Sequence, residues 1–215
     1  MTTMRSKLSD AKIVFWDFDG VIKDSLDTKA DIFIDLFAAD NPKLQSKIRR
    51  HHLENGGVPR AIKIPLYLKW NGVPEPYSCI ERWNRAFSTL AVDKVCASPW
   101  VPGVLDYLEL NYRKKVFIIV SATPNWELNN IVEKLGLNKY FQLVCGGPTS
   151  KLSLIQNGLA KYEMGAQDAV MLGDSETDLE AANIAGIAFG LRRTPFNKSL
   201  KLVNKKFEFE NFYDI

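Results

Sequence analysis

Four short runs of apolar residues, each closed by glycine or polar residues, constrain the fold of this chain more than any other feature. They occupy residues 13–16, 116–120, 143–145 and 169–172. Within these runs the apolar residues follow one another without alternating with polar ones. Such continuity is typical of parallel strands that helices cover on both faces of a sheet.

Segments with helical periodicity follow three of the four runs. Each has apolar residues three and four positions apart, and two of them end at a glycine. The repeating residues are Trp126, Leu128, Ile131, Val132 and Leu135; Leu152, Ile155, Leu159 and Tyr162; and Leu179, Ala182 and Ala185. Strands that alternate with helices predict an α/β fold with a Rossmann-like, doubly wound parallel sheet.

The long stretch between the first two runs contains no convincing strand. Residues 32–37 form one apolar helical face, and Pro76 suits the first turn of a later helix that Tyr77 and Trp83 continue. This stretch is therefore predicted to be helical.

The simplest organisation is a core interrupted by a helical insert. We expect residues 1–24 and 99–215 to form the core, and residues 25–98 to form the insert. The last dozen residues, which include three phenylalanines, are predicted to form an edge strand or a packed tail.

The charge of the chain is nearly balanced, since 28 basic and 25 acidic residues give a net charge of +3. This balance gives no case for a nucleic-acid partner. No segment approaches the ~20 apolar residues of a membrane span, and the first residues lack the apolar stretch of a signal peptide. Cys79, Cys96 and Cys145 show no metal-binding spacing and are expected to be reduced thiols. We expect a soluble, cytoplasmic protein, and the sequence leaves its oligomeric state open.

Polar side chains stand where the predicted strands end. The carboxyl ends of parallel strands share one edge of a sheet, so these side chains are expected to lie together. In chain order they are Asp17, Asp19, Ser121, Lys151, Asp174 and Asp178, with Lys151 opening the helix that follows the third run.

These residue types suit the transfer of a phosphoryl group. Carboxylates such as Asp17 and Asp174 are hard oxygen ligands for Mg²⁺, the expected cofactor. A serine hydroxyl can hold phosphate oxygens, and a lysine can neutralise their charge. Asp19, two residues past a nucleophilic Asp17, can protonate the leaving oxygen and later deprotonate the attacking water.

Each of these residues alone has an ordinary structural explanation. An aspartate after a strand is usually a turn or cap residue, a serine is often a helix cap, and a lysine is usually exposed. Their conjunction at strand ends, in a workable order, favours catalysis.

On these residues the chain resembles the haloacid dehalogenase-like hydrolases. The four motifs of the resemblance are 15–21 (Phe-Trp-Asp-Phe-Asp-Gly-Val), 121–123 (Ser-Ala-Thr), Lys151, and 173–178 (Gly-Asp-Ser-Glu-Thr-Asp). Together they span essentially the whole chain. The presence of Asp19 favours phosphate esters over the dehalogenation that gives the superfamily its name.

The resemblance implies a role for each motif. Asp17 would become a phospho-aspartate, with Asp19 as the acid and base. The phosphoryl group would be bound by Ser121, Ala122 and Lys151, and magnesium by Asp17, the backbone carbonyl of Asp19, Asp174 and Asp178. The helical insert would be a cap that closes over the site.

Residues 56–63 of the insert resemble the substrate-specificity loop of cap-bearing sugar-phosphate enzymes, including the β-phosphoglucomutases. By this resemblance Arg60, with Lys63 as the second candidate, would meet a distal anionic group of the substrate. His51 and His52, just before the loop, are predicted to be a surface pair.

The prediction is a magnesium-dependent phosphatase of a small phosphorylated metabolite, with a sugar phosphate as the hypothesis from the cap loop. A phosphosugar mutase would use the same motifs and stays an alternative. The alternatives of another class are a receiver-like module and a catalytically silent binding protein. The position of the acidic pair after the first strand disfavours a receiver, and the presence of both Asp17 and Asp19 disfavours a silent protein.

Overall fold

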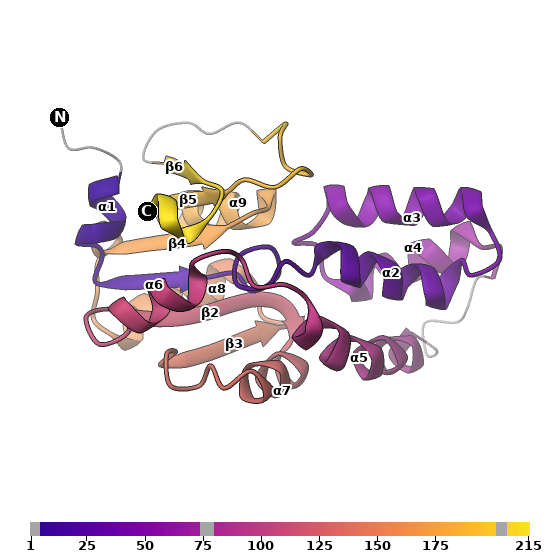
Figure 1. The fold of residues 1–215 in the computed structure, drawn as a ribbon, viewed down its shortest axis with the longest axis horizontal. Coiled ribbons are helices and arrows are strands. Elements are labelled where there is room, and N and C mark those ends of the chain that lie inside the picture. The colour runs from indigo at the N-terminus through magenta and orange to yellow at the C-terminus, as the bar shows by residue number, and fades with distance from the viewer. Residues whose placement is uncertain (1–4, 74–79, 201–205) are drawn as a thin grey trace.

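The computed structural model describes residues 5–73, 80–200 and 206–215 (Figure 1). Its strands are β1 (Ile13–Trp16), β2 (Val116–Pro124), β3 (Leu143–Gly147), β4 (Ala169–Gly173), β5 (Ala188–Arg192) and β6 (Lys206–Phe209). Its helices are α1 (Arg5–Asp10), α2 (Leu26–Phe37), α3 (Pro42–Glu54), α4 (Arg60–Trp70), α5 (Ile80–Ala97), α6 (Val104–Asn111), α7 (Asn125–Lys134), α8 (Lys151–Lys161) and α9 (Glu176–Ala185). Short 3₁₀ turns occupy Ala166–Asp168 and Phe212–Asp214.

The strands form one parallel sheet in the order β3-β2-β1-β4-β5-β6. Alternate residues of β1 feed two separate apolar clusters, because successive strand residues point to opposite faces of a sheet. Phe15 belongs to the same cluster as Ile155 of α8 on one face, and Trp16 belongs to the same cluster as Leu128 of α7 on the other. The predicted doubly wound α/β fold is confirmed.

The four predicted strands all form, and the expected edge strand of the tail is β6. Strand β5 and helix α6 were not predicted. Trp126 does not share the buried face of α7, since its side chain is 54% exposed. It precedes Leu128 by two residues, which places it about 200° away around the helix. The predictions for Pro76, Tyr77 and Cys79 lie outside the described residues.

Helices α2 to α5 follow β1 in the sequence. Figure 1 shows α2, α3 and α4 together beyond one end of the sheet, with α5 leading back to it. Aromatic rings form the centre of this helical group: the Phe33 centroid lies 4.5 Å from that of Phe87 and 5.1 Å from that of Tyr67. The division at residues 24/25 and 98/99 stays a prediction.

The chain enters and leaves the helical group through two adjacent segments. Asp24 N–H donates to Pro99 O (2.8 Å), and Val101 N–H donates to Ile22 O (3.1 Å). Backbone hydrogen bonds thus tie the two crossings to each other beside the carboxyl end of β1.

Across the described ranges, every helix is too short or too polar to cross a membrane. The cytoplasmic location expected from the sequence stays a prediction.

Candidate active site

The site lies where the sheet order turns. Asp17 follows β1 and Asp174 follows β4, and these two strands are neighbours. Asp17 N–H donates to Leu172 O (2.8 Å), which holds the end of β1 against β4. Ligand sites of doubly wound sheets form at this switch point, outside the carboxyl ends of the strands.

Three buried aspartates form a cluster at this point. Carboxylate oxygens of Asp17, Asp174 and Asp178 all lie within 4.8 Å of one another. Lys151 Nζ donates to Asp17 Oδ2 (2.6 Å) and to Asp178 Oδ1. One lysine against three carboxylates leaves a formal charge of −2 (−3 + 1) if all are ionised.

Burial and neighbouring charges raise the pKa values of Asp17 and Asp174. Burial, together with the charge of Asp178, raises the pKa of Asp17 to about 7, although Lys151 opposes the shift. Burial and the charges of Asp17 and Asp178 hold the pKa of Asp174 well above its usual range. A divalent cation among these oxygens would balance the charge, and carboxylate oxygens are the donors that Mg²⁺ prefers. The cluster therefore fits a magnesium ion.

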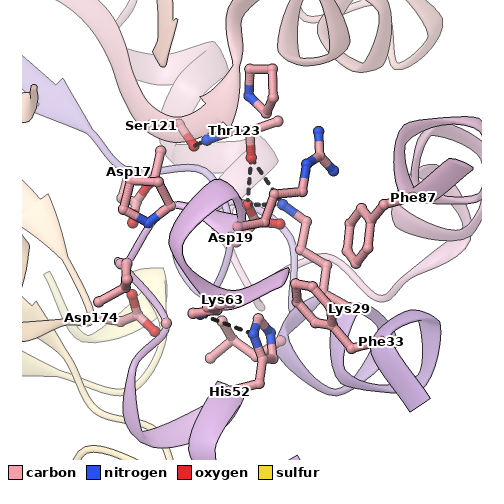
Figure 2. Close-up of a pocket in the computed structure, with 18 residues that line it drawn as sticks. Asp17, Asp19, Lys29, Phe33, His52, Lys63, Phe87, Ser121, Thr123 and Asp174 are labelled. Carbon is pink, nitrogen blue, oxygen red and sulfur yellow. Dashed lines mark hydrogen bonds and ion pairs between the residues drawn. The ribbon is translucent and has the colours of Figure 1, made fainter. Parts of the chain in front are cut away.

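Asp19 lies outside this cluster, in a network of its own. Its Oδ1 accepts from Ser25 Oγ (2.6 Å), and its Oδ2 accepts from Thr123 Oγ1 (3.1 Å) and from Lys29 Nζ. Burial alone would raise the pKa of Asp19, but the charge and hydrogen bond of Lys29, with the two hydroxyl donors, lower it. Figure 2 shows Asp19 facing Lys29 and Thr123 across the cavity from Asp174.

An irregularity in β2 shapes the side of the site that carries Ser121. From Val120 to Pro124 the strand advances by four positions, whereas its partner β3 advances by only two, from Cys145 to Gly147. Such bulges re-aim side chains and occur next to active sites. Within this bulge Ser121 Oγ accepts from Thr123 N–H (3.2 Å). Ser121 and Ala122 line the same cavity as Asp17, Asp19 and Asp174.

Lys151 reaches the cluster from the first residue of α8. Ser150 caps this helix, because its side chain accepts from Ser153 N–H (3.2 Å). Serine is a favoured N-cap, which explains why α8 begins at Lys151. The structure thus brings together all six polar residues that the sequence places at strand ends or at the start of α8.

The helical group closes the cavity, which measures about 50 Å³. The lining residues on this side include Lys29, His52, Gly57, Arg60 and Lys63. A methyl group built on Gly57 would lie 1.8 Å from Thr177 Oγ1 and 2.5 Å from Ser175 Oγ. The loop before α4 therefore touches the end of the fourth motif directly.

The two cap residues expected to meet the substrate have different partners. Arg60 Nη2 donates to Ser88 Oγ (2.8 Å) and forms an ion pair with the fully buried Glu127 of α7. Lys63 Nζ lies 3.0 Å from His52 Nδ1. Lys63 is buried, the Arg60 side chain is 9% exposed, and both line the cavity.

A family model of the haloacid dehalogenase-like hydrolases matches residues 14–191. The chain belongs to this family. A phosphoglycolate phosphatase of Vibrio cholerae is 26% identical over 201 residues, which cover 86% of this chain and 85% of that protein.

Solved structures agree with this fold. One from Haemophilus somnus, described as a predicted phosphoglycolate phosphatase, matches with a TM-score of 0.78 at 18% identity and covers 95% of this chain and 96% of that one. CbbY from Rhodobacter sphaeroides, in complex with xylulose-(1,5)bisphosphate, matches with a TM-score of 0.75 at 17% identity, covering 94% and 95%. These likenesses show that the haloacid dehalogenase-like fold spans the chain.

One prediction for this hydrolase was wrong. His52 is 4% exposed and so does not form a surface pair with His51. It follows Leu44 and Ile48 at intervals of four and therefore lies on the buried face of α3.

Sequence reasoning also missed Lys29 as a site residue of this hydrolase. It lies beside Ala30 on the buried face of α2 that Leu26 and Phe33 continue. An ionisable residue at a core position of an amphipathic helix was the available signal for both Lys29 and His52.

Proposed function

We propose that this hydrolase is a magnesium-dependent phosphatase that acts on a small phosphorylated metabolite. The observation that carries the proposal is the buried cluster of Asp17, Asp174 and Asp178 around Lys151, with Asp19 held separately across the cavity. The relatives named phosphoglycolate phosphatases support a phosphate ester as the substrate.

The chain's own residues divide the work of two successive steps. The Asp17 carboxylate attacks phosphorus, while Lys151 and Ser121 hold oxygens of the transferring group. Asp19, in its protonated form, gives a proton to the leaving oxygen, and the alcohol departs. Asp19 then takes a proton from water, which attacks phosphorus and releases inorganic phosphate from Asp17.

Magnesium would be held by side-chain oxygens of Asp17, Asp174 and Asp178. When bound, it would lower the repulsion between these carboxylates and an anionic phosphate. Lys151 would keep Asp17 and Asp178 in place as it does in the free protein.

Phosphate release from a panel of small phosphate esters tests this function. With Mg²⁺ in excess, we expect phosphate release from at least one ester. A chelator should lower it about 100-fold or more, and added Mg²⁺ should restore it, while circular dichroism shows an unchanged fold.

Full activity in chelator would contradict the metal requirement. Interconversion of sugar-phosphate isomers with no net phosphate release would instead support the mutase alternative.

A further inference from the structure

Three basic residues line the cap side of the cavity, and two of them already have carboxylate partners. Lys29 is paired with Asp19, and Arg60 is paired with Glu127. Among the described residues, Lys63 is the one lysine or arginine lining this cavity that has no carboxylate in ion-pair contact.

The partner of Lys63 does not supply a negative charge. Lys63 Nζ forms a hydrogen bond with His52 Nδ1 at 3.0 Å. Burial and the charges of Lys63 and Lys29 hold the pKa of His52 well below its usual range, so the ring is neutral. Lys63 itself is 1% exposed.

A buried ammonium without a counter-charge is costly, because water no longer solvates it. Accordingly, burial and the nearby charge of Lys29 lower the pKa of Lys63 to about 7, although the charges of Asp19 and Asp174 oppose the shift. An anion in the cavity would complete this arrangement. Figure 2 shows Lys63 and His52 side by side on the edge of the cavity that also holds Asp19 and Asp174.

The size and charge of the cavity restrict that anion. The cavity measures about 50 Å³ and opens partly to solvent, which favours a short molecule, since a single water needs roughly 10–15 Å³. One unpaired lysine matches the single charge of a carboxylate. A second phosphate, with up to two charges, would need a further cation, and the charge of Arg60 is already matched by Glu127.

Resting on the phosphatase function proposed above, we propose that the substrate is the phosphate ester of a short hydroxy acid and that its carboxylate binds Lys63. His52 positions the Lys63 ammonium through its Nδ1 atom. Arg60 braces α4 against α7 through Glu127 and does not contact the substrate.

The test compares kcat/KM for phosphoglycolate, which carries a carboxylate, with that for ethyl phosphate, which does not. The wild type should prefer phosphoglycolate. Lys63→Met should lower this preference about tenfold or more, the usual size of one charge-assisted contact. Lys63→Arg, which keeps the charge, should retain more of the preference than Lys63→Met.

The matched control is the double variant Arg60→Met/Glu127→Gln, which removes the other cap cation without leaving a buried carboxylate unpaired. This variant should lower kcat/KM for both substrates by similar factors. The ratio of the two kcat/KM values should stay within about twofold of the wild-type ratio. Loss of the preference in this variant, or its survival in Lys63→Met, would overturn the assignment. If the wild type prefers a bisphosphate to phosphoglycolate and Lys63→Met loses that preference, the group that binds Lys63 is not a carboxylate and the proposal is overturned.

A second measurement needs no substitution at Lys63. 3-Phosphonopropionate should inhibit the wild type at least about tenfold more strongly than propylphosphonate, its counterpart without the carboxylate. Equal inhibition would overturn the proposal. Failure of the phosphatase function itself would look different, because the wild type would then release no phosphate from any ester.

Discussion

Gly20, directly after Asp19, shows how closely a single residue of the site is constrained. Its φ of +79° lies in the left-handed region that residues with a side chain rarely adopt. A methyl group built on it would lie 2.4 Å from Asp174 Oδ2. A side chain at this position would therefore both strain the backbone and displace a carboxylate of the proposed metal site.

Gly20→Ala should lower the free energy of unfolding by about 1–3 kcal/mol through backbone strain and should also lower phosphate release about tenfold or more by moving Asp174. Urea unfolding and the phosphate assay measure the two effects separately. Gly72→Ala is the matched control, since Gly72 has a φ of +74° but no atom within 4 Å of a built methyl group. It should lose stability by strain and keep the activity. Full activity in Gly20→Ala would contradict the placement of Asp174.

The ion pair of Arg60 with Glu127 joins elements that are distant in the sequence. Arg60 opens α4, Ser88 lies on α5, and Glu127 lies on α7 beside the sheet. Arg60 also stacks over the Phe87 ring at 4.6 Å. The pair is buried, so its two charges depend on each other.

Arg60→Met alone should lower the free energy of unfolding by about 3–5 kcal/mol, because it leaves the Glu127 carboxylate buried without a partner. Glu127→Gln alone should also destabilise the protein. The double variant should lose less than the sum of the two, a coupling that urea unfolding of all four proteins measures. Additive losses would show that the two side chains do not stabilise each other.

How far the sequence predicts each element depends on how local its signals are. The strands carrying Asp17 and Asp174 are contiguous apolar runs, so both their positions and the residues that follow them are predictable. Strand β5 was missed because its residues Ala188–Arg192 include Gly190 and end in a charge. The partners of Lys29 and Arg60 could not be predicted, because Thr123 and Glu127 lie 94 and 67 residues away along the chain.

In the molecule as a whole, the sheet and the helical group each supply half of the site. The sheet provides the carboxylates and Lys151 at its switch point, and the helical group provides Lys29, His52 and Lys63. The helical group and the sheet meet where Gly57 contacts the fourth motif. The same fold thereby places an acidic cluster on the sheet and basic side chains on the helical group, on different sides of one cavity.

The proposed phosphatase mechanism depends on Asp17 as the nucleophile, and Asp17→Asn tests that role directly. The substitution keeps the size of the side chain and an oxygen for the Phe18 N–H, which donates to Asp17 Oδ1 at 2.7 Å. It removes the negative charge that attacks phosphorus. Phosphate release in Mg²⁺ from the best ester of the panel should fall about a thousandfold or more, with the fold unchanged by circular dichroism. Undiminished release from the Asp17→Asn protein would contradict the proposed mechanism.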